Sequence, residues 1–85
     1  SGYEHIKILV NDIKYIKSDA DYTELYLPNK KHLSSEPLRY WLENLDQNQF
    51  LRIHKSYIIN SAKIVKVSGS QVYLEEEIVI LFSKW

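Results

Sequence analysis

Only one segment of this chain has the hydrophobic spacing of a helix, and this limits the fold to a mainly β architecture. Four large apolar side chains in the segment recur at intervals of three and four residues: Leu38, Trp41, Leu42 and Leu45. Residues with this spacing lie on one side of an α-helix. The sequence therefore predicts a single short helix over about residues 36–45.

Three residues before this apolar stripe could cap the helix: Ser34, Ser35 and Glu36. Pro37 follows them, and proline is tolerated in a first turn because its missing N–H would have no partner within the helix there. The sequence leaves the choice of cap open.

The other apolar runs are short, rich in β-branched and aromatic residues, and bounded by turn-forming residues. They predict strands at residues 5–10, 12–17, 22–27, 50–53, 58–59, 63–68, 71–74 and 78–82. Asn11-Asp12 is expected to join the first two strands as a hairpin, and Pro28-Asn29 to end the third. Residues 68–70 and 75–77 are expected to be turns. The fold class is mainly β, an elongated arrangement of small antiparallel sheets with one short helix.

The length and composition favour one folded domain over residues 1–85. An 85-residue chain that is 45% hydrophobic can build one core and has no room for a second. The absence of cysteine excludes disulfides and thiolate sites, and no apolar run approaches the ~20 residues of a membrane span. We therefore expect a soluble module, without a membrane partner, in the cytoplasm.

The first residues indicate that the sequence is part of a longer protein. It has no methionine and begins Ser1-Gly2, which we interpret as residues left after removal of a tag. We expect an excised domain whose regulatory part lies outside this sequence.

The charges cancel overall but are unevenly distributed. The chain carries 11 basic and 11 acidic residues. Residues 50–66 contain His54 and four cations without any acid: Arg52, Lys55, Lys63 and Lys66. This pattern fits a basic surface that meets an acidic partner, but charge alone favours an ordinary solvated sheet face.

Signatures of catalysis or of cofactor binding are missing. His5, His32 and His54 lie far apart, without the spacing that places two metal ligands on one face. Two glycines cannot form a phosphate-binding or dinucleotide-binding loop. Asp19 and Asp21 are better explained by a turn than by acid–base chemistry. We expect no catalytic residues, no metal and no cofactor, and therefore no enzyme.

Several stretches together resemble the LytTR domain, the DNA-binding output domain of a class of bacterial response regulators. They are DIKYIKSDADYTELYL (12–27), SSEPLRYWLENLDQNQFLRIHKSYIIN (34–60), AKIVKV (62–67) and IVILFSKW (78–85). The most specific is FLRIHKSYIINSAKI, which matches the family's Phe-x-Arg-x-His-x-Ser and the hydrophobic pair and Asn that follow. The resemblance covers nearly the whole chain.

The resemblance implies an elongated fold of small antiparallel sheets that binds DNA through loops between strands. These loops would enter successive major grooves, in place of a recognition helix. The positions that match the family's contact regions are Tyr22, Thr23, His54, Lys55, Ser56, Ser83 and Lys84. Arg52 joins them as a possible phosphate clamp.

Some of these residues also have a structural interpretation. Arg52 could pair with an acid such as Glu24 across the sheet, and His54 could bond a backbone carbonyl to fix the loop. Asn60 is expected to form a turn rather than contact DNA. Tyr22 could be a packed aromatic, which would leave Thr23 as the better contact, and the register of that loop is open by one residue.

The chain departs from the family's pattern in two ways. Lys84 stands where the family commonly has Arg, which favours a phosphate contact over bidentate reading of guanine. Acids at Asp19, Asp21 and Glu24 lie beside one expected contact loop and would weaken nonspecific affinity.

The function predicted by the resemblance is sequence-specific binding of double-stranded promoter DNA, as the output domain of a two-component transcriptional regulator. The receiver domain would lie outside this sequence. The isolated domain is expected to be monomeric, and the full-length protein to dimerise on DNA repeats. The alternative is a small β-rich protein–protein interaction module without nucleic acid, which could pair a partner's strand along an open sheet edge.

Overall fold

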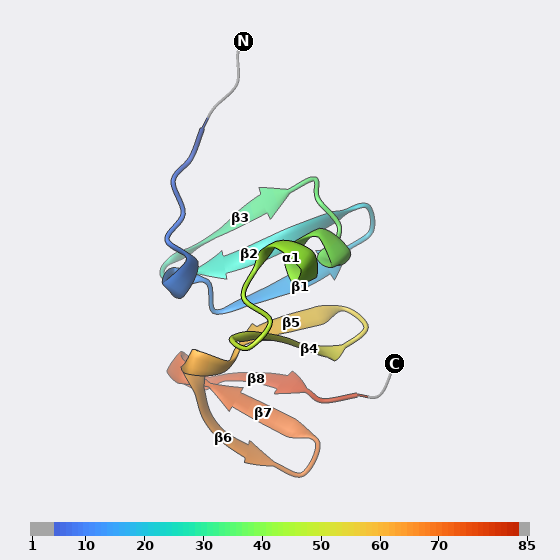
Figure 1. The fold of residues 1–85 in the computed structure, drawn as a ribbon. Helices are drawn as coiled ribbons and strands as arrows, with labels where there is room; N and C mark the ends of the chain where they lie inside the picture. The colour runs from blue at the N-terminus through green and yellow to red at the C-terminus, as the bar shows by residue number, and fades with distance from the viewer. Residues whose placement is uncertain (1–4, 84–85) are drawn as a thin grey trace.

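A computed structural model describes residues 5–83, which form eight strands, one α-helix and three 3-10 helices (Figure 1). The strands are β1 (Tyr15–Asp19), β2 (Tyr22–Leu27), β3 (Lys30–Ser34), β4 (Phe50–His54), β5 (Tyr57–Asn60), β6 (Ile64–Ser68), β7 (Gln71–Leu74) and β8 (Ile78–Leu81). The α-helix α1 spans Leu38–Asn44, and the 3-10 helices are η1 (Val10–Asp12), η2 (Ser61–Lys63) and η3 (Glu75–Glu77).

The strands build two antiparallel sheets. One has five strands in the order β3-β2-β1-β5-β4, and the other has three in the order β6-β7-β8. The molecule measures 47 × 26 × 21 Å along its principal axes. The predicted fold class, an elongated arrangement of small antiparallel sheets with one helix, is confirmed.

Each face of the five-stranded sheet buries its own apolar cluster. One face packs against α1, whose Leu38 is buried there together with Ile16, Leu25 and Ile58. The other face packs against the three-stranded sheet, where Ile59 is buried. Because successive side chains of a strand point to opposite faces, neighbouring residues of β5 contribute to both clusters. Burial of both faces explains why this strand reads as a continuous apolar run.

The strands predicted after the helix are confirmed to within one residue at each end, as is the strand at residues 22–27. The turn at residues 68–70 is also confirmed, with Gly69 at φ +59°. Residues 75–77 form η3, in which Glu76 and Glu77 both have positive φ.

The predicted hairpin between residues 5–10 and 12–17 is wrong. Residues 5–9 have no regular secondary structure, residues 10–12 form η1, and β1 begins only at Tyr15. The reason is topological, because both edges of β1 are already paired, one with β2 and the other with β5. The apolar residues before β1 instead supply packing, as Ile8 does against the cluster below α1.

Strand β3 is absent from the prediction. Pro28-Asn29 does end β2, but it does so as a turn that returns the chain along β2. Asn29 has φ 64° there, a conformation that asparagine tolerates. The sequence of β3 is too polar to predict a strand. It is polar because β3 is an edge strand, whose residues are exposed or half-buried.

The helix is shorter than predicted, at both ends. It begins at Leu38 with Pro37 at the N-cap position, and no side chain caps it. Ser34 Oγ accepts a hydrogen bond from the Glu36 N–H at 3.1 Å, ahead of the helix. None of the three predicted caps is therefore used.

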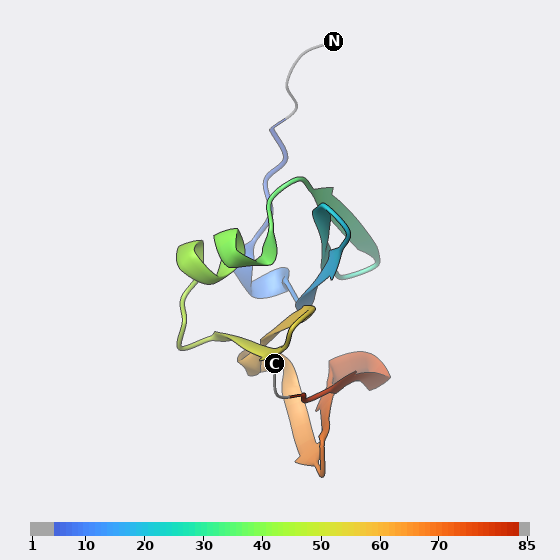
Figure 2. The same cartoon turned by 90° about the vertical axis from the view of Figure 1, so that its right-hand side faces the viewer.

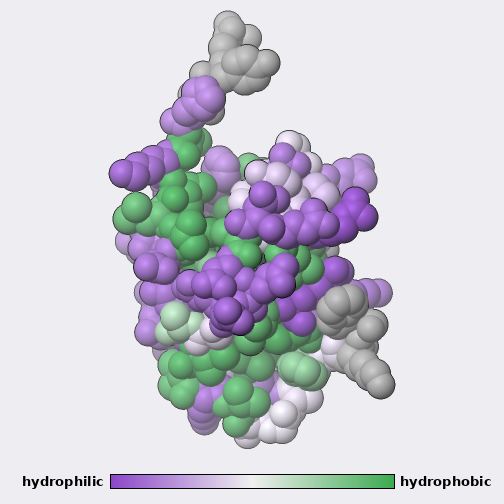
Figure 3. All heavy atoms as spheres, viewed as in Figure 1, coloured by the Kyte–Doolittle hydropathy of each residue, from purple (hydrophilic) through white to green (hydrophobic). Residues whose placement is uncertain are grey.

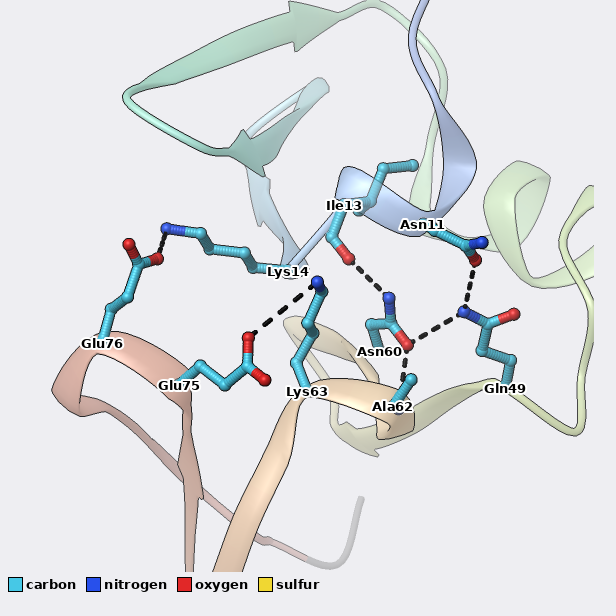
Figure 4. A network of polar contacts seen from close by, with 9 residues as sticks. All are labelled: Asn11, Ile13, Lys14, Gln49, Asn60, Ala62, Lys63, Glu75 and Glu76. Carbon is cyan, nitrogen blue, oxygen red and sulfur yellow. Dashed lines mark hydrogen bonds and ion pairs between the residues drawn. The ribbon is translucent and has the colours of Figure 1, made fainter.

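A network of polar contacts around Asn60 lies at the end of the molecule shown in Figure 4, where β5 leads into η2. The fully buried Asn60 donates from Nδ2 to the Ile13 carbonyl at 2.9 Å. Its Oδ1 accepts from the Ala62 N–H at 3.0 Å and from Gln49 Nε2 at 3.1 Å. The expectation that Asn60 forms a turn is confirmed, since its side chain caps η2.

Two ion pairs lie beside this network and tie η3 to the neighbouring elements. Lys14 pairs with Glu76, and Lys63 pairs with Glu75 at 3.9 Å (Figure 4). Both glutamates are largely exposed, so each pair contributes little to stability. They link η3 to the residue before β1 and to η2.

Candidate nucleic-acid interface

Segments that are distant in sequence converge on one end of the molecule. They are the β1–β2 turn, the start of α1, the β4–β5 turn and the residues after β8, all on the right-hand side of Figure 1. Figure 2 looks directly onto this end. The backbone N–H of Ser18 donates to the Ser56 carbonyl at 2.8 Å, and that of Ser83 to the Ile53 carbonyl at 2.8 Å. Main-chain hydrogen bonds therefore hold β1 to the β4–β5 turn and the residues after β8 to β4.

A groove of about 460 Å³ opens between three of these segments. Its lining includes Ala20 and Asp21 from the β1–β2 turn, Leu38 and Arg39 from α1, and Arg52 and Lys55 from β4 and its turn. The three cations face one acid among these residues. The groove is thus a polar site with a surplus of positive charge, suited to an anion such as phosphate.

Arg52 fixes the β4–β5 turn from inside the groove. One terminal guanidinium nitrogen, Nη2, donates to the Lys55 carbonyl at 2.6 Å, and Nε lies 3.4 Å from the His54 carbonyl. A β-bulge between Arg52 and His54 bends the strand at this point. The strand predicted at residues 50–53 therefore ends here, one residue later, at His54.

The pairing of Arg52 with Glu24 is wrong. Strands β1 and β5 separate β4 from β2. Glu24 also lies on the opposite face, where Tyr26 donates to it at 2.7 Å and Lys31 at 3.2 Å. The Tyr26 hydroxyl and then the Lys31 ammonium hold the pKa of the Glu24 carboxyl below its usual value.

The predicted DNA contact of Thr23 does not fit its burial. Thr23 has no exposed surface. Its hydroxyl donates to the Glu36 carbonyl at 2.9 Å and accepts from Trp41 Nε1 at 2.9 Å. Thr23 therefore connects β2 to α1 and helps to fix the position of the helix beside the groove.

Replacing Thr23 by valine is expected to lower the free energy of unfolding by about 1–3 kcal/mol. The change keeps the shape of the side chain but leaves the Trp41 N–H and the Glu36 carbonyl without the hydroxyl. Urea denaturation measures the loss, and Thr23→Ser, which keeps the hydroxyl, serves as the control. A Thr23→Val variant of unchanged stability that failed to bind DNA would show that the hydroxyl acts on DNA instead.

Tyr22 is half-buried beside the β1–β2 turn, and its hydroxyl donates to Asp19 Oδ2 at 2.9 Å. The carboxylate that accepts this hydrogen bond raises the pKa of the Tyr22 phenol. Ala20 adopts φ 55° in the same turn, a conformation that is uncommon outside glycine. The turn is thus held in one shape by strand pairing and by this side-chain bond.

The remaining residues predicted to contact DNA either lie near the β4–β5 turn or fall outside the residues that the structure describes. Lys55 is exposed at the tip of the β4–β5 turn, with Ser56 next to it. Ser83 is exposed and follows β8 beside β4. Lys84 lies outside residues 5–83, which the structure describes.

Arg39 lines the groove and is not among the residues predicted from the sequence. It is exposed in the first turn of α1 and lines the groove together with Arg52 and Lys55. The apolar stripe of the helix places it on the solvent side. Its position next to the β4–β5 turn depends on how the helix packs, which the sequence does not show.

The described residues contain no candidate metal site. No group of three or more His, Cys, Asp or Glu side chains in residues 5–83 is arranged to hold a metal ion. The same residues include no helix long and apolar enough to span a membrane.

The chain matches known proteins in sequence. Residues 3–84 match the family model of the LytTr DNA-binding domain. The chain is 37% identical over 71 residues to an uncharacterized response regulatory protein of Vibrio cholerae, and 40% identical over 45 residues to the transcriptional regulatory protein LytR of Staphylococcus aureus. The matches cover 79% and 53% of this chain, but only 27% and 18% of those two proteins.

The fold also matches a solved structure. A chain described as the LytTr DNA-binding domain of a response regulator from Bacillus cereus superposes with a TM-score of 0.83. The superposition covers 92% of this chain and 76% of that one, at 17% sequence identity. At this identity the likeness establishes a shared fold.

Proposed function

The chain belongs to the LytTR DNA-binding domain family, and from this membership we propose that it reads double-stranded DNA through the turns at one end of its five-stranded sheet. The observation that carries the proposal is the convergence of the β1–β2 turn, the start of α1 and the β4–β5 turn around a cationic groove. The short length of α1, which has seven residues, also favours turns over a recognition helix.

The chemistry of each residue at the proposed interface determines which kind of contact it would make with DNA. Arg39 and Lys55 are exposed cations and would contact phosphates, which fixes the register of the protein on the duplex. Lys84 would add a third such contact. Arg52 orients the β4–β5 turn through carbonyl groups. His54, Ser56 and Ser83 would supply the neutral donors and acceptors that distinguish bases in the major groove.

We further propose that the domain is the output part of a two-component regulator. The relatives are response regulatory and transcriptional regulatory proteins, and the chain spans less than a third of their length. A receiver domain in the remaining length would control dimerisation on repeated sites. Pairing of two modules then supplies the affinity that a neutral single domain lacks.

The test is a selection of random DNA duplexes by the 85-residue chain at low salt. We expect an enriched sequence motif, and we expect Lys55→Ala combined with Lys84→Ala to lose it. A matched control, Lys7→Ala with Lys30→Ala, removes the same charge from exposed residues at the other end of the sheet. If nothing is enriched, even by a version fused to a dimerising segment, the proposal is wrong.

A second candidate function, addition of a partner's strand, is favoured by strand β6. It is an edge of the three-stranded sheet, and its Val65 and Val67 are 64% and 61% exposed. Apolar side chains gather over this sheet in Figure 3. Salt dependence separates the two functions, because DNA binding releases counterions and weakens steeply as salt rises, whereas strand addition responds weakly.

A further inference from the structure

The ring of His54 is held in a defined position at the end of β4. Its Nδ1 accepts a hydrogen bond from the Ser56 backbone N–H at 3.1 Å. The ring also packs edge-on against Tyr57, with centroids 5.3 Å apart and an interplanar angle of 68°. This bond differs from the one expected from the sequence, in which His54 would bond a backbone carbonyl, because here the histidine accepts a hydrogen bond rather than donating one.

The bond to Ser56 determines which ring nitrogen carries the proton. A backbone N–H can only donate, so Nδ1 must present its lone pair. A neutral imidazole whose Nδ1 accepts carries its hydrogen on Nε2. His54 is thereby restricted to the tautomer with an Nε2–H donor.

The Nε2 atom reaches the surface. Among the residues that the structure describes, it has no hydrogen-bond partner, and the ring as a whole is half-buried. In that part of the chain, no buried side-chain nitrogen or oxygen lacks a partner. Nε2 must therefore be accessible to solvent, next to the exposed Lys55.

We propose that the Ser56 N–H sets the His54 tautomer so that the ring presents one fixed hydrogen-bond donor, Nε2–H, to an acceptor atom on DNA. The acceptor is N7 or O6 of a purine edge, O4 of thymine, or a phosphate oxygen, all of which accept but do not donate. A fixed donor rejects the amino groups of cytosine and adenine. The inference rests on the proposed function and adds the chemistry of one contact.

The tautomer can be measured without DNA. Long-range ¹H–¹⁵N correlation spectra of the 85-residue chain distinguish a protonated from an unprotonated ring nitrogen. We expect Nδ1 of His54 to show the unprotonated signature and Nε2 the protonated one. A ring protonated on Nδ1 and not on Nε2 overturns the inference and leaves the proposed function intact.

Two substitutions test the roles of the two ring nitrogens of His54 separately. His54→Asn places an oxygen near the Nδ1 position, where it can accept from the Ser56 N–H, and removes the distal donor. We expect DNA affinity about three- to tenfold weaker, the equivalent of one lost hydrogen bond. Thermal stability should fall only by the lost contact with the Tyr57 ring. His54→Gln keeps a distal N–H and loses the near acceptor. We expect lower thermal stability and, for the folded protein, a smaller loss of DNA affinity than in His54→Asn, because the distal donor is kept.

The duplex selection then identifies the acceptor. If His54→Asn changes the preferred base at one position, the acceptor is a base edge. If it weakens all sequences equally, the acceptor is a phosphate oxygen. Original affinity in His54→Asn contradicts the inference, even if His54→Gln fails to fold. If the original chain enriches no DNA at all, the proposed function fails, whatever the tautomer.

Discussion

Replacing Asn60 by alanine is expected to lower the free energy of unfolding by about 3 kcal/mol, the largest effect of any single polar substitution considered for this chain. Asn60 is fully buried and makes three hydrogen bonds, to the Ile13 carbonyl, the Ala62 N–H and Gln49 Nε2. Its removal leaves the Ile13 carbonyl without this donor and opens the junction between η2 and the five-stranded sheet. Chemical denaturation with urea measures the change.

Asn44→Ala is the matched control. Asn44 also donates from Nδ2 to a backbone carbonyl, that of Tyr40 at 2.8 Å, but it is exposed on α1. Water replaces this bond when the side chain is removed, so we expect a change within about 0.5 kcal/mol. Equal effects for the two variants would mean that the buried network at Asn60 adds no stability.

Removing Arg39 and Lys55 together is expected to weaken DNA binding on the order of a hundredfold at low salt. Each cation is exposed beside the groove, and each charge-assisted hydrogen bond to a phosphate would contribute about 1.5 kcal/mol or more. The slope of log affinity against log salt should also become shallower by about 1.8, because two phosphates are no longer neutralised. Fluorescence anisotropy of a labelled duplex over a series of salt concentrations gives both quantities.

The control removes the same charge from the other end of the sheet, through Lys7→Ala and Lys30→Ala. We expect a small affinity loss and an unchanged slope, because these residues are not placed at the interface. If both double variants behave alike, net charge alone governs binding, and the groove has no particular role.

The sequence predicts most strands and the family, because both depend on local patterns. Alternating or continuous apolar runs identify β2 and the strands from β4 to β8, whose faces are buried in one or both clusters. The same reasoning fails for residues 5–10, an apolar run that finds no strand partner, and for the polar edge strand β3. Periodicity reports which residues prefer burial, but it does not report which strand edges are free.

The candidate site is predicted only in part, for a related reason. The motif identifies the β4–β5 turn and its neighbours, including Lys55 and Ser56. It does not reveal that Thr23 is buried under Trp41, or that Arg39 lies beside Arg52. Both facts depend on how α1 packs on β2, a contact between segments that are distant in the chain.

The sequence by itself thus determined the mainly β class, the single helix and the membership of a DNA-binding family. Each of these depends on the type and spacing of residues that are neighbours in the chain. Only the tertiary structure decided which cations share one surface, which polar groups are buried supports, and which backbone N–H faces Nδ1 of His54. These depend on distances between side chains brought together by strand pairing and helix packing. A one-residue change of register in a strand would move its side chains to the opposite face of the sheet.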